Sequence, residues 1–329
     1  MSVTVRVPAK VNLHLGVGGV RADGFHELVT VFQAVSLYDI VEATPAASLG
    51  LTLTGADTRG IPQGTDNLAL RAAVQLAERL GVEPAVHLRI DKQIPVAGGM
   101  AGGSADAAAA LVACARLWGA DTDHPAIAEV AERLGSDVPF ALSGGNALGT
   151  GRGERITPLA GHGRFHWVLA EAEQGLSTPL VFGEFDRRAA RAGAPAADTG
   201  QHRTALLRSF ADVLDSGEAA RLAPLLGNDL QDAALALRPE LDATLRLGRR
   251  AGALGALVSG SGPTCAFLTE GAASAADLSE FLLGSGCCRA VRTAHGPVPG
   301  ATVIDPADAA GSLETAGAVR SPRIRKGAQ

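Results

Sequence analysis

The sequence predicts an α+β protein of two domains, in which strands and helices alternate along the chain. It has 329 residues, about twice the usual size of a domain. Hydrophobic residues make up 47% of the chain and charged residues 19%, which allows a sizeable core. Patterns of period two and patterns of helical spacing follow one another. A new set of elements begins at Phe165, so we place the domains at residues 1–160 and 161–300 and expect a disordered tail over 301–329.

Two strands should open the chain. Apolar residues alternate before and after Pro8, over residues 3–7 and 11–17. The polar residues of this stretch share the opposite face: Lys10, Asn12 and His14. A turn-rich connection leads to the apolar stretch 28–43, which is typical of a further pair of strands.

The first domain should continue with helices around one more strand. Apolar residues at helical spacing predict a helix over residues 68–80, with Thr65 or Asp66 as its cap. The pattern then predicts a strand over 86–90, an alanine-rich helix that ends near Trp118 and a helix over 125–134.

The second domain is expected to hold strands and helices in a new order. Its elements are a strand over 165–172, a loop over 173–182, an exposed excursion over 187–203, a helix over 241–252, strands over 253–259 and 264–269, a helix over 273–284 and a strand over 288–294.

Composition excludes several classes of protein. The net charge is −5 and the pI is near 5.9, which argues against a general nucleic-acid binder. The apolar runs are too short for a membrane span and no signal sequence precedes them, so we expect a cytoplasmic protein without a membrane partner. The four cysteines form no CxxC pair, which favours reduced structural thiols over zinc sites or disulfides.

The stretch "PVAGGMAGGSADAAAAL", residues 95–111, places four glycines between a strand and a helix. Free amides at a helix start, together with the helix dipole, favour a phosphate. The spacing fits neither a Walker A loop, because Ser104 stands where lysine is required, nor the GxGxxG loop of dehydrogenases. A glycine-eased packing of helix on sheet, with Ser104 as a simple cap, remains the structural alternative.

This stretch resembles the PxxxGLGGGSSxA loop of the GHMP kinases, a family that includes homoserine and phosphomevalonate kinases. Four further stretches resemble family motifs in the same order: "PAKVNLHLGV", "RADGFHEL", "SDVPFAL" and "SGSGPTCAF". The resemblance implies a ribosomal-protein-S5-domain-2-like N-terminal domain and a ferredoxin-like α/β sandwich at the C-terminus. The sequence departs from the loop pattern at Met100, Ala101 and Ala105.

The resemblance implies ATP as phosphoryl donor and Mg²⁺ as its metal. The ATP-binding residues would be Pro95, Val96, Ala97, Gly98, Gly99, Met100, Ala101, Gly102, Gly103, Ser104 and Ala105. Asn67 would contact the adenosine, although it could equally cap a helix. The Ser104 hydroxyl would reach a phosphate or the Mg²⁺, whose carboxylate ligand the sequence does not identify. Residues 259–264 would close the cleft from the second domain, or form only a tight turn.

Asp137 and Lys10 match the catalytic pair of the family. Asp137 would accept the proton of the acceptor hydroxyl, and without the resemblance it would be interpreted as a helix cap before Pro139. Lys10 would hold that carboxylate in its ionised form. The chain contains 26 arginines and three lysines, so a lysine retained here favours a function that the larger, fork-shaped guanidinium would not serve.

The resemblance further implies an acceptor with a cytidine diphosphate handle, phosphorylated at the 2-hydroxyl of its methylerythritol part in the non-mevalonate route to isoprenoids. Asn12 would position that hydroxyl, Phe25 and Phe182 would enclose the cytosine, and His26 would bond its edge. The alternatives are a GHMP kinase for homoserine or phosphomevalonate, and a catalytically silent nucleotide-binding regulator.

Overall fold

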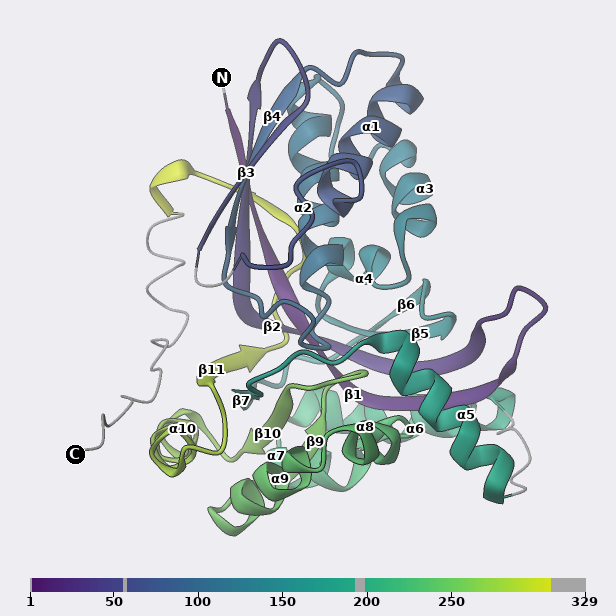
Figure 1. Ribbon diagram of the computed structural model, residues 1–329, viewed down its shortest axis with the longest axis vertical. Helices are drawn as coiled ribbons and strands as arrows, with labels where there is room; N and C mark the ends of the chain where they lie inside the picture. Colours follow the sequence, from purple (N-terminus) through teal and green to yellow (C-terminus); the bar gives the residue numbers. More distant parts are fainter. Residues whose placement is uncertain (1, 56–57, 193–198, 309–329) are drawn as a thin grey trace, which may run out of the picture.

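Two antiparallel-rich sheets with helices packed against them form the protein (Figure 1). The computed structural model describes residues 2–55, 58–192 and 199–308. Within these residues one sheet has eight strands and the other has four. The α+β fold expected from the sequence is confirmed.

The larger sheet is built on two long strands, β1 (Val3–Val20) and β2 (His26–Pro45). Each was expected as a pair of strands, but each is one continuous strand whose pairing is interrupted by β-bulges. The β1–β2 register shifts at Pro8/Ala9, at Asn12/His14 and at Val17/Val20. The other strands of this sheet are β3 (Gly50–Gly55), β4 (Val86–Lys92), β5 (Asn146–Gly151), β6 (Arg155–Leu159), β8 (Gly227–Asn228) and β12 (Thr302–Ile304).

Four helices cover one face of this sheet (Figure 1): α1 (Leu68–Leu80), α2 (Gly102–Leu117), α3 (Pro125–Leu134) and α4 (Val138–Ser143). Helix α2 is buried almost all round, which its alanines permit because small side chains let neighbouring elements approach closely. The cap of α1 is Asn67, not Thr65 or Asp66: its side-chain oxygen accepts hydrogen bonds from the amides of Ala69 and Leu70.

The smaller sheet has the strand order β11-β7-β10-β9. Its strands are β7 (Phe165–Glu171), β9 (Gly255–Val258), β10 (Cys265–Thr269) and β11 (Ala290–Gly296). The helices of this half are α5 (Thr178–Ala192), α6 (Thr199–Ser216), α7 (Ala219–Leu222), the 3-10 turn η1 (Ala223–Leu225), α8 (Gln231–Leu237), α9 (Glu240–Arg250) and α10 (Ala272–Ser285).

Helix α5 corrects the loop expected over 173–182 and the excursion expected from residue 187. Pro179 stands in its first turn, where proline is tolerated, and Glu184 forms ion pairs with Arg187 and Arg188 along the helix. Helix α6 likewise begins inside the expected excursion, whose middle, residues 193–198, lies outside the described residues.

Strands β8 and β12 come from the second half of the sequence and join the first sheet. β8 pairs with β1 in parallel, and Asp229 accepts a hydrogen bond from the Val17 amide at 2.8 Å. β12 pairs with the start of β1, Thr4 opposite Ile304. The tail expected to be disordered from residue 301 is therefore ordered at its start, because β1 offers an open edge there. Residues 309–329 lie outside the described residues.

The two sheets are also joined by buried polar side chains. The Trp167 indole of β7 donates to the Gln33 side chain of β2 at 2.8 Å, and Gln33 in turn donates to Asn146 of β5 at 2.8 Å. Gln33 and Trp167 have no exposed surface. This chain of bonds fixes how the smaller sheet lies against the larger one.

Candidate active site

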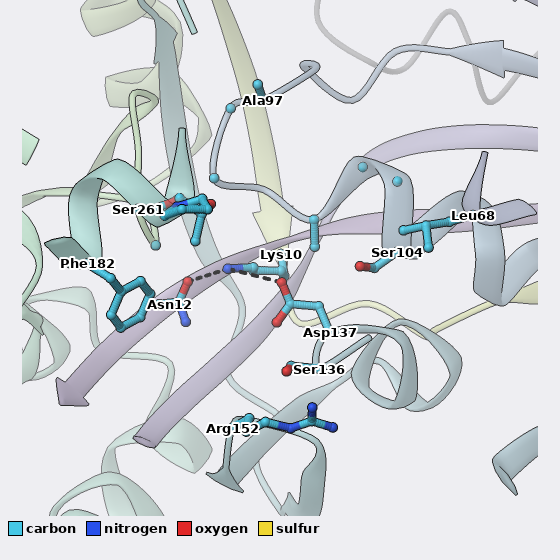
Figure 2. Close-up of a pocket in the computed structure, with 18 of the residues that line it drawn as sticks. Lys10, Asn12, Leu68, Ala97, Ser104, Ser136, Asp137, Arg152, Phe182 and Ser261 are labelled. Carbon is cyan, nitrogen blue, oxygen red and sulfur yellow. Dashed lines mark hydrogen bonds and ion pairs between the residues drawn. The ribbon is translucent and has the colours of Figure 1, made fainter. Parts of the chain in front are cut away.

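A cavity of about 1020 Å³ contains most of the residues that the sequence singled out (Figure 2). It is lined by the middle of β1 and β2, the glycine loop, the starts of α1, α4 and α5, and the turn before β10. A volume at the upper end of the range for small-molecule sites gives room for two ligands side by side. The expected catalytic, nucleotide and acceptor residues therefore meet in one place.

Lys10 and Asp137 face each other at the centre of this cavity (Figure 2). The Lys10 ammonium lies 3.8 Å from an Asp137 carboxylate oxygen and donates to Asn12 Oδ1 at 2.5 Å. Asn12 donates in turn to the Thr30 hydroxyl at 2.8 Å, which fixes its amide orientation. His14, expected on the same face, is outside the cavity lining and lies 3.4 Å from the Leu225 carbonyl.

Burial changes the chemistry of Lys10. Its side chain is only 8% exposed, and this loss of hydration lowers the pKa of its ammonium, while the charge of Asp137 raises it. Gly260 packs directly on this group: a Cβ added there would lie 3.1 Å from Lys10 Nζ and 3.2 Å from Asn12 Oδ1. The amine is thus largely buried and closely packed on this side.

Asp137 stands at the N-cap position of α4, but its side chain makes no capping hydrogen bond. The capping interpretation of this residue is therefore wrong for the carboxylate, which faces Lys10 instead. Its side chain is 30% exposed, so it is open to the cavity. The adjoining Ser136 also lines the cavity (Figure 2).

The glycine loop curves around the start of α2 through a series of left-handed residues. Gly99 has φ +74°, and Ala97 and Ala101 have φ of 51° and 61°, a region that costs an alanine about 1–2 kcal/mol. Ala101 is thus strained where the related loops have glycine. Ser104 lies inside α2, whose N-cap is Ala101, so it is not the cap proposed as the structural alternative.

Nine of the eleven loop residues expected to bind ATP line the cavity; Met100 and Ala105 do not. Their side chains are buried in the core, and the Met100 carbonyl accepts a hydrogen bond from the Lys10 amide at 3.4 Å. The loop is also tied to the turn before β10: Ser259 donates to the Gly99 carbonyl at 3.3 Å and the Thr264 amide donates to Gly98 at 3.3 Å. Residues 259–264 are thus both a turn and a wall of the cavity.

A buried ion cluster supports the other side of the loop. Lys92 at the end of β4 donates to Asp39 and, at 2.7 Å, to Asp106 in the second turn of α2. Burial raises the pKa of Asp106 to about 8, against the opposing effect of Lys92. Its Oδ1 atom is buried without a hydrogen-bond partner among the described residues, and Asp106 lines the cavity.

Asn67 acts as a helix cap in this structure. Its side-chain oxygen accepts from the first amides of α1, and its nitrogen donates to the Pro62 carbonyl at 2.8 Å. Both polar groups are therefore engaged. Asn67 nevertheless lines the cavity beside the glycine loop.

At the far end of the cavity lie the aromatic residues expected to bind a base. His26 stacks on Phe182 with ring centres 5.3 Å apart, and its Nε2 lies 3.0 Å from a carboxylate oxygen of Asp186 on α5. Phe25 is 54% exposed and packs under the guanidinium of Arg152, 5.0 Å away. In this structure His26, not Phe25, is the ring packed against Phe182.

Sequence reasoning missed several lining residues. Asp106, Arg152 and Asp186 are charged side chains of this cavity that no motif singled out. Arg152 had one usable signal, because "TGRGE" places it between two glycines in a turn. The other two lie on helices, α2 and α5, where a lone carboxylate is ordinarily a solvated surface group.

Comparisons with known proteins agree with this geometry. The family model described as "GHMP kinases N terminal domain" matches residues 67–145, and "GHMP kinases C terminal" matches residues 206–285. A 4-diphosphocytidyl-2-C-methyl-D-erythritol kinase from Streptomyces avermitilis is 56% identical over 304 residues, which cover 92% of this chain and 100% of that protein. The chain belongs to the GHMP kinase family.

Two further relatives of this GHMP kinase carry the same name, and a third protein shares only its fold. The enzyme from Nocardia farcinica is 56% identical, covering 92% of this chain and 97% of its own. A crystal structure of 4-(cytidine 5'-diphospho)-2C-methyl-D-erythritol kinase is 34% identical, with a TM-score of 0.69 over 88% of this chain and 98% of that one. A homoserine kinase from Cytophaga hutchinsonii shares the fold, with a TM-score of 0.72 at 17% identity over 92% of this chain and 97% of that one.

Within the described part of this GHMP kinase, no helix is long and apolar enough to cross a membrane. No group of three or more His, Cys, Asp or Glu side chains there is placed to hold a metal ion. The four cysteines are free thiols in this structure.

Proposed function

We propose that this GHMP kinase transfers the γ-phosphoryl group of ATP to the 2-hydroxyl of 4-diphosphocytidyl-2-C-methyl-D-erythritol, giving the 2-phosphate and ADP in the non-mevalonate route to isoprenoids. The observation that carries the proposal is the cavity that joins a phosphate-type glycine loop, a Lys10–Asp137 pair and an aromatic end with His26. The names of relatives more than 50% identical support it.

The triphosphate is expected to lie against the glycine loop. The amides at the start of α2 and the dipole of that helix favour negative charge there. No lysine of the loop itself is available to neutralise it, since residues 95–105 contain none. Asn67 and Leu68 at the start of α1 would then lie beside the adenosine.

Proton transfer is assigned to Asp137. Its carboxylate would accept the proton of the acceptor hydroxyl as the phosphoryl group moves. Lys10 would keep that carboxylate ionised and orient the hydroxyl. Asn12 holds the Lys10 ammonium in place, with both of its own polar groups occupied, so we assign it to positioning Lys10 as well as to the acceptor.

The residues present fit an Mg²⁺ ion that arrives with ATP. Ser104 and the unpartnered Oδ1 of Asp106 are oxygen donors of the cavity next to the loop, and Mg²⁺ takes few protein ligands when it is bound through phosphates. When bound, the ion would neutralise charge that develops on the phosphate oxygens.

The base is assigned to the aromatic end. Phe25 and Phe182 line the same end of the cavity as His26, and stacking on both faces of a cytosine would require it to displace the His26–Phe182 contact. We also propose that the enzyme acts in the cytoplasm, because ATP is its phosphoryl donor.

The test is ADP release from Mg-ATP with the cytidine-diphospho acceptor, with homoserine and phosphomevalonate as control acceptors and Asp137→Asn as an inactive control. We expect turnover with the cytidine-diphospho acceptor alone, and phosphorus NMR should show a new monophosphate ester. Turnover with homoserine or phosphomevalonate alone would assign the other kinase function. ATP binding without turnover of any acceptor would indicate the silent regulator.

A further inference from the structure

Arg152 occupies a rigid turn at the edge of the cavity. The turn joins β5 to β6, and three hydrogen bonds hold its backbone: Gly151 donates to the Glu27 carboxylate at 3.1 Å, the Arg152 amide to Glu154 at 2.6 Å and Gly153 to the Thr150 carbonyl at 3.1 Å. The side chain is 30% exposed and lines the cavity. Its base is therefore fixed, while the guanidinium faces the ligand space.

Arg152 and its turn lie between the two ends of the acceptor site. The guanidinium packs over the Phe25 ring at 5.0 Å. The turn itself runs close to Ser136, because a Cβ added on Gly153 would lie 3.8 Å from the Ser136 Cβ. Figure 2 shows Arg152 below Ser136, on the same side of the cavity as Asp137. A substrate that reaches from the catalytic pair to the aromatic end passes this residue.

The charges of the cavity leave Arg152 available for an anion. Three Lys or Arg side chains line it among the described residues: Lys10, Lys92 and Arg152. Lys10 faces Asp137, and Lys92 is held between Asp39 and Asp106. Arg152 approaches only Glu154 within ion-pair range in the described structure, at 4.0 Å, and that carboxylate oxygen already accepts the Arg152 amide. Asp23 is a more distant electrostatic neighbour.

We infer that Arg152 binds the diphosphate of the acceptor and thereby selects a nucleoside diphosphate over the nucleoside alone. This inference rests on the proposed function, since it assumes that the base lies at Phe25 and Phe182. A guanidinium presents parallel N–H donors that match two phosphate oxygens. Its stacking on Phe25 keeps the planar group oriented toward the adjoining phosphates.

The test compares the binding of cytidine, CMP and CDP by calorimetry to the full-length protein and to Arg152→Gln and Arg152→Lys. We expect Arg152→Gln to bind CDP about 10- to 100-fold more weakly, the usual effect of losing charge-assisted hydrogen bonds, and to bind cytidine as the wild type does. Arg152→Lys should retain part of the preference for CDP, because it keeps the charge without the fork. The KM for the acceptor should rise in parallel, while the KM for ATP stays unchanged.

Ionic strength gives a second readout. Added salt should weaken the binding of CDP to the wild type more than to Arg152→Gln, because screening acts on the charge that the variant lacks. An unchanged ratio of CDP to cytidine affinity in Arg152→Gln would overturn the inference. An equal loss for cytidine and CDP would also overturn it, since Arg152 would then only support Phe25. A wild type that binds no cytidine ligand and turns over another acceptor would instead refute the proposed function.

Discussion

Gly260→Ala tests whether the fit around Lys10 is needed for catalysis. Gly260 has φ +55°, a conformation that costs alanine about 1–2 kcal/mol in the folded state. Alanine also lowers the entropy of the unfolded chain, which offsets about 0.4–1 kcal/mol of this cost. The net loss of stability of about 1 kcal/mol should lower the melting temperature by about 1–2 °C.

The same substitution should reduce turnover more than this loss of stability explains. The new Cβ would lie 3.0 Å from the Gly99 carbonyl oxygen and 3.1 Å from Lys10 Nζ, so the glycine loop and the ammonium must shift by roughly a few tenths of an ångström. A misplacement of about 1 Å near a reacting centre costs about 100-fold in rate. We therefore expect kcat to fall about 10-fold, measured as ADP release at saturating substrates well below the melting temperature.

Gly81→Ala is the matched control. Gly81 ends α1 with φ +68°, and an added Cβ there meets no atom within 4 Å. This variant should carry the same backbone strain without the close contacts, so it should lose no more stability than Gly260→Ala and keep the wild-type kcat. The reasoning is refuted if Gly260→Ala turns over at the wild-type rate, or if Gly81→Ala loses as much activity as Gly260→Ala.

Three further predictions concern single side chains. Lys10→Met should abolish turnover yet melt at a higher temperature near pH 7, because burial lowers the pKa of this amine in the native state and its charge therefore costs stability. The gain in stability from methionine should shrink as the pH rises toward 10.5. A destabilised variant would contradict the argument. Gln33→Leu should lower the free energy of unfolding by about 1–3 kcal/mol in urea titrations, because the buried Trp167 N–H loses its acceptor. The kcat of this variant should stay unchanged. An equally stable variant would show that this hydrogen bond contributes little to stability. Cys287 should be the first thiol alkylated by iodoacetamide, at a rate that falls as the pH drops through about 6, because a hydrogen bond from Cys288 lowers its pKa to about 6. Cys114 should react more slowly, because burial raises its pKa to about 12. Equal labelling of Cys287 and Cys114 by mass spectrometry would refute this prediction.

The sequence predicted the positions of helices and strands best where the residues of the element themselves show a helical or a strand period. The helices α1, α3, α9 and α10 and the strands β9 and β10 lie close to the stretches that their periodicity predicted. It was least informative for α5, since "STPLVF" begins with residues typical of a loop and its apolar side chains face Leu176 and the neighbouring helix α8 only after folding. The secondary-structure propensity of a segment does not show which distant part of the chain it will pack against.

The same distinction applies to the site. Lys10 and Asp137 came from motifs, and the fold brings them to 3.8 Å. The sequence does not identify Asp106 and Asp186 as site residues, because their role depends on which cavity they face. Arg152 was missed although two glycines mark its turn. The structural alternative in which Ser104 caps α2 is wrong, because a backbone turn through Ala101, in a conformation rare for alanine, begins the helix three residues earlier.

The pairing of β12 with the start of β1 adds to the larger sheet an edge strand that comes much later in the chain. Residues Val3 to Val7 therefore leave the ribosome long before their partner Thr302–Ile304. Until then that edge stays open to pairing with another chain. Because Thr4 and Ile304 are neighbours, a short linker between the two ends would make this late contact a local one, and a circular permutant should complete its sheet early in synthesis.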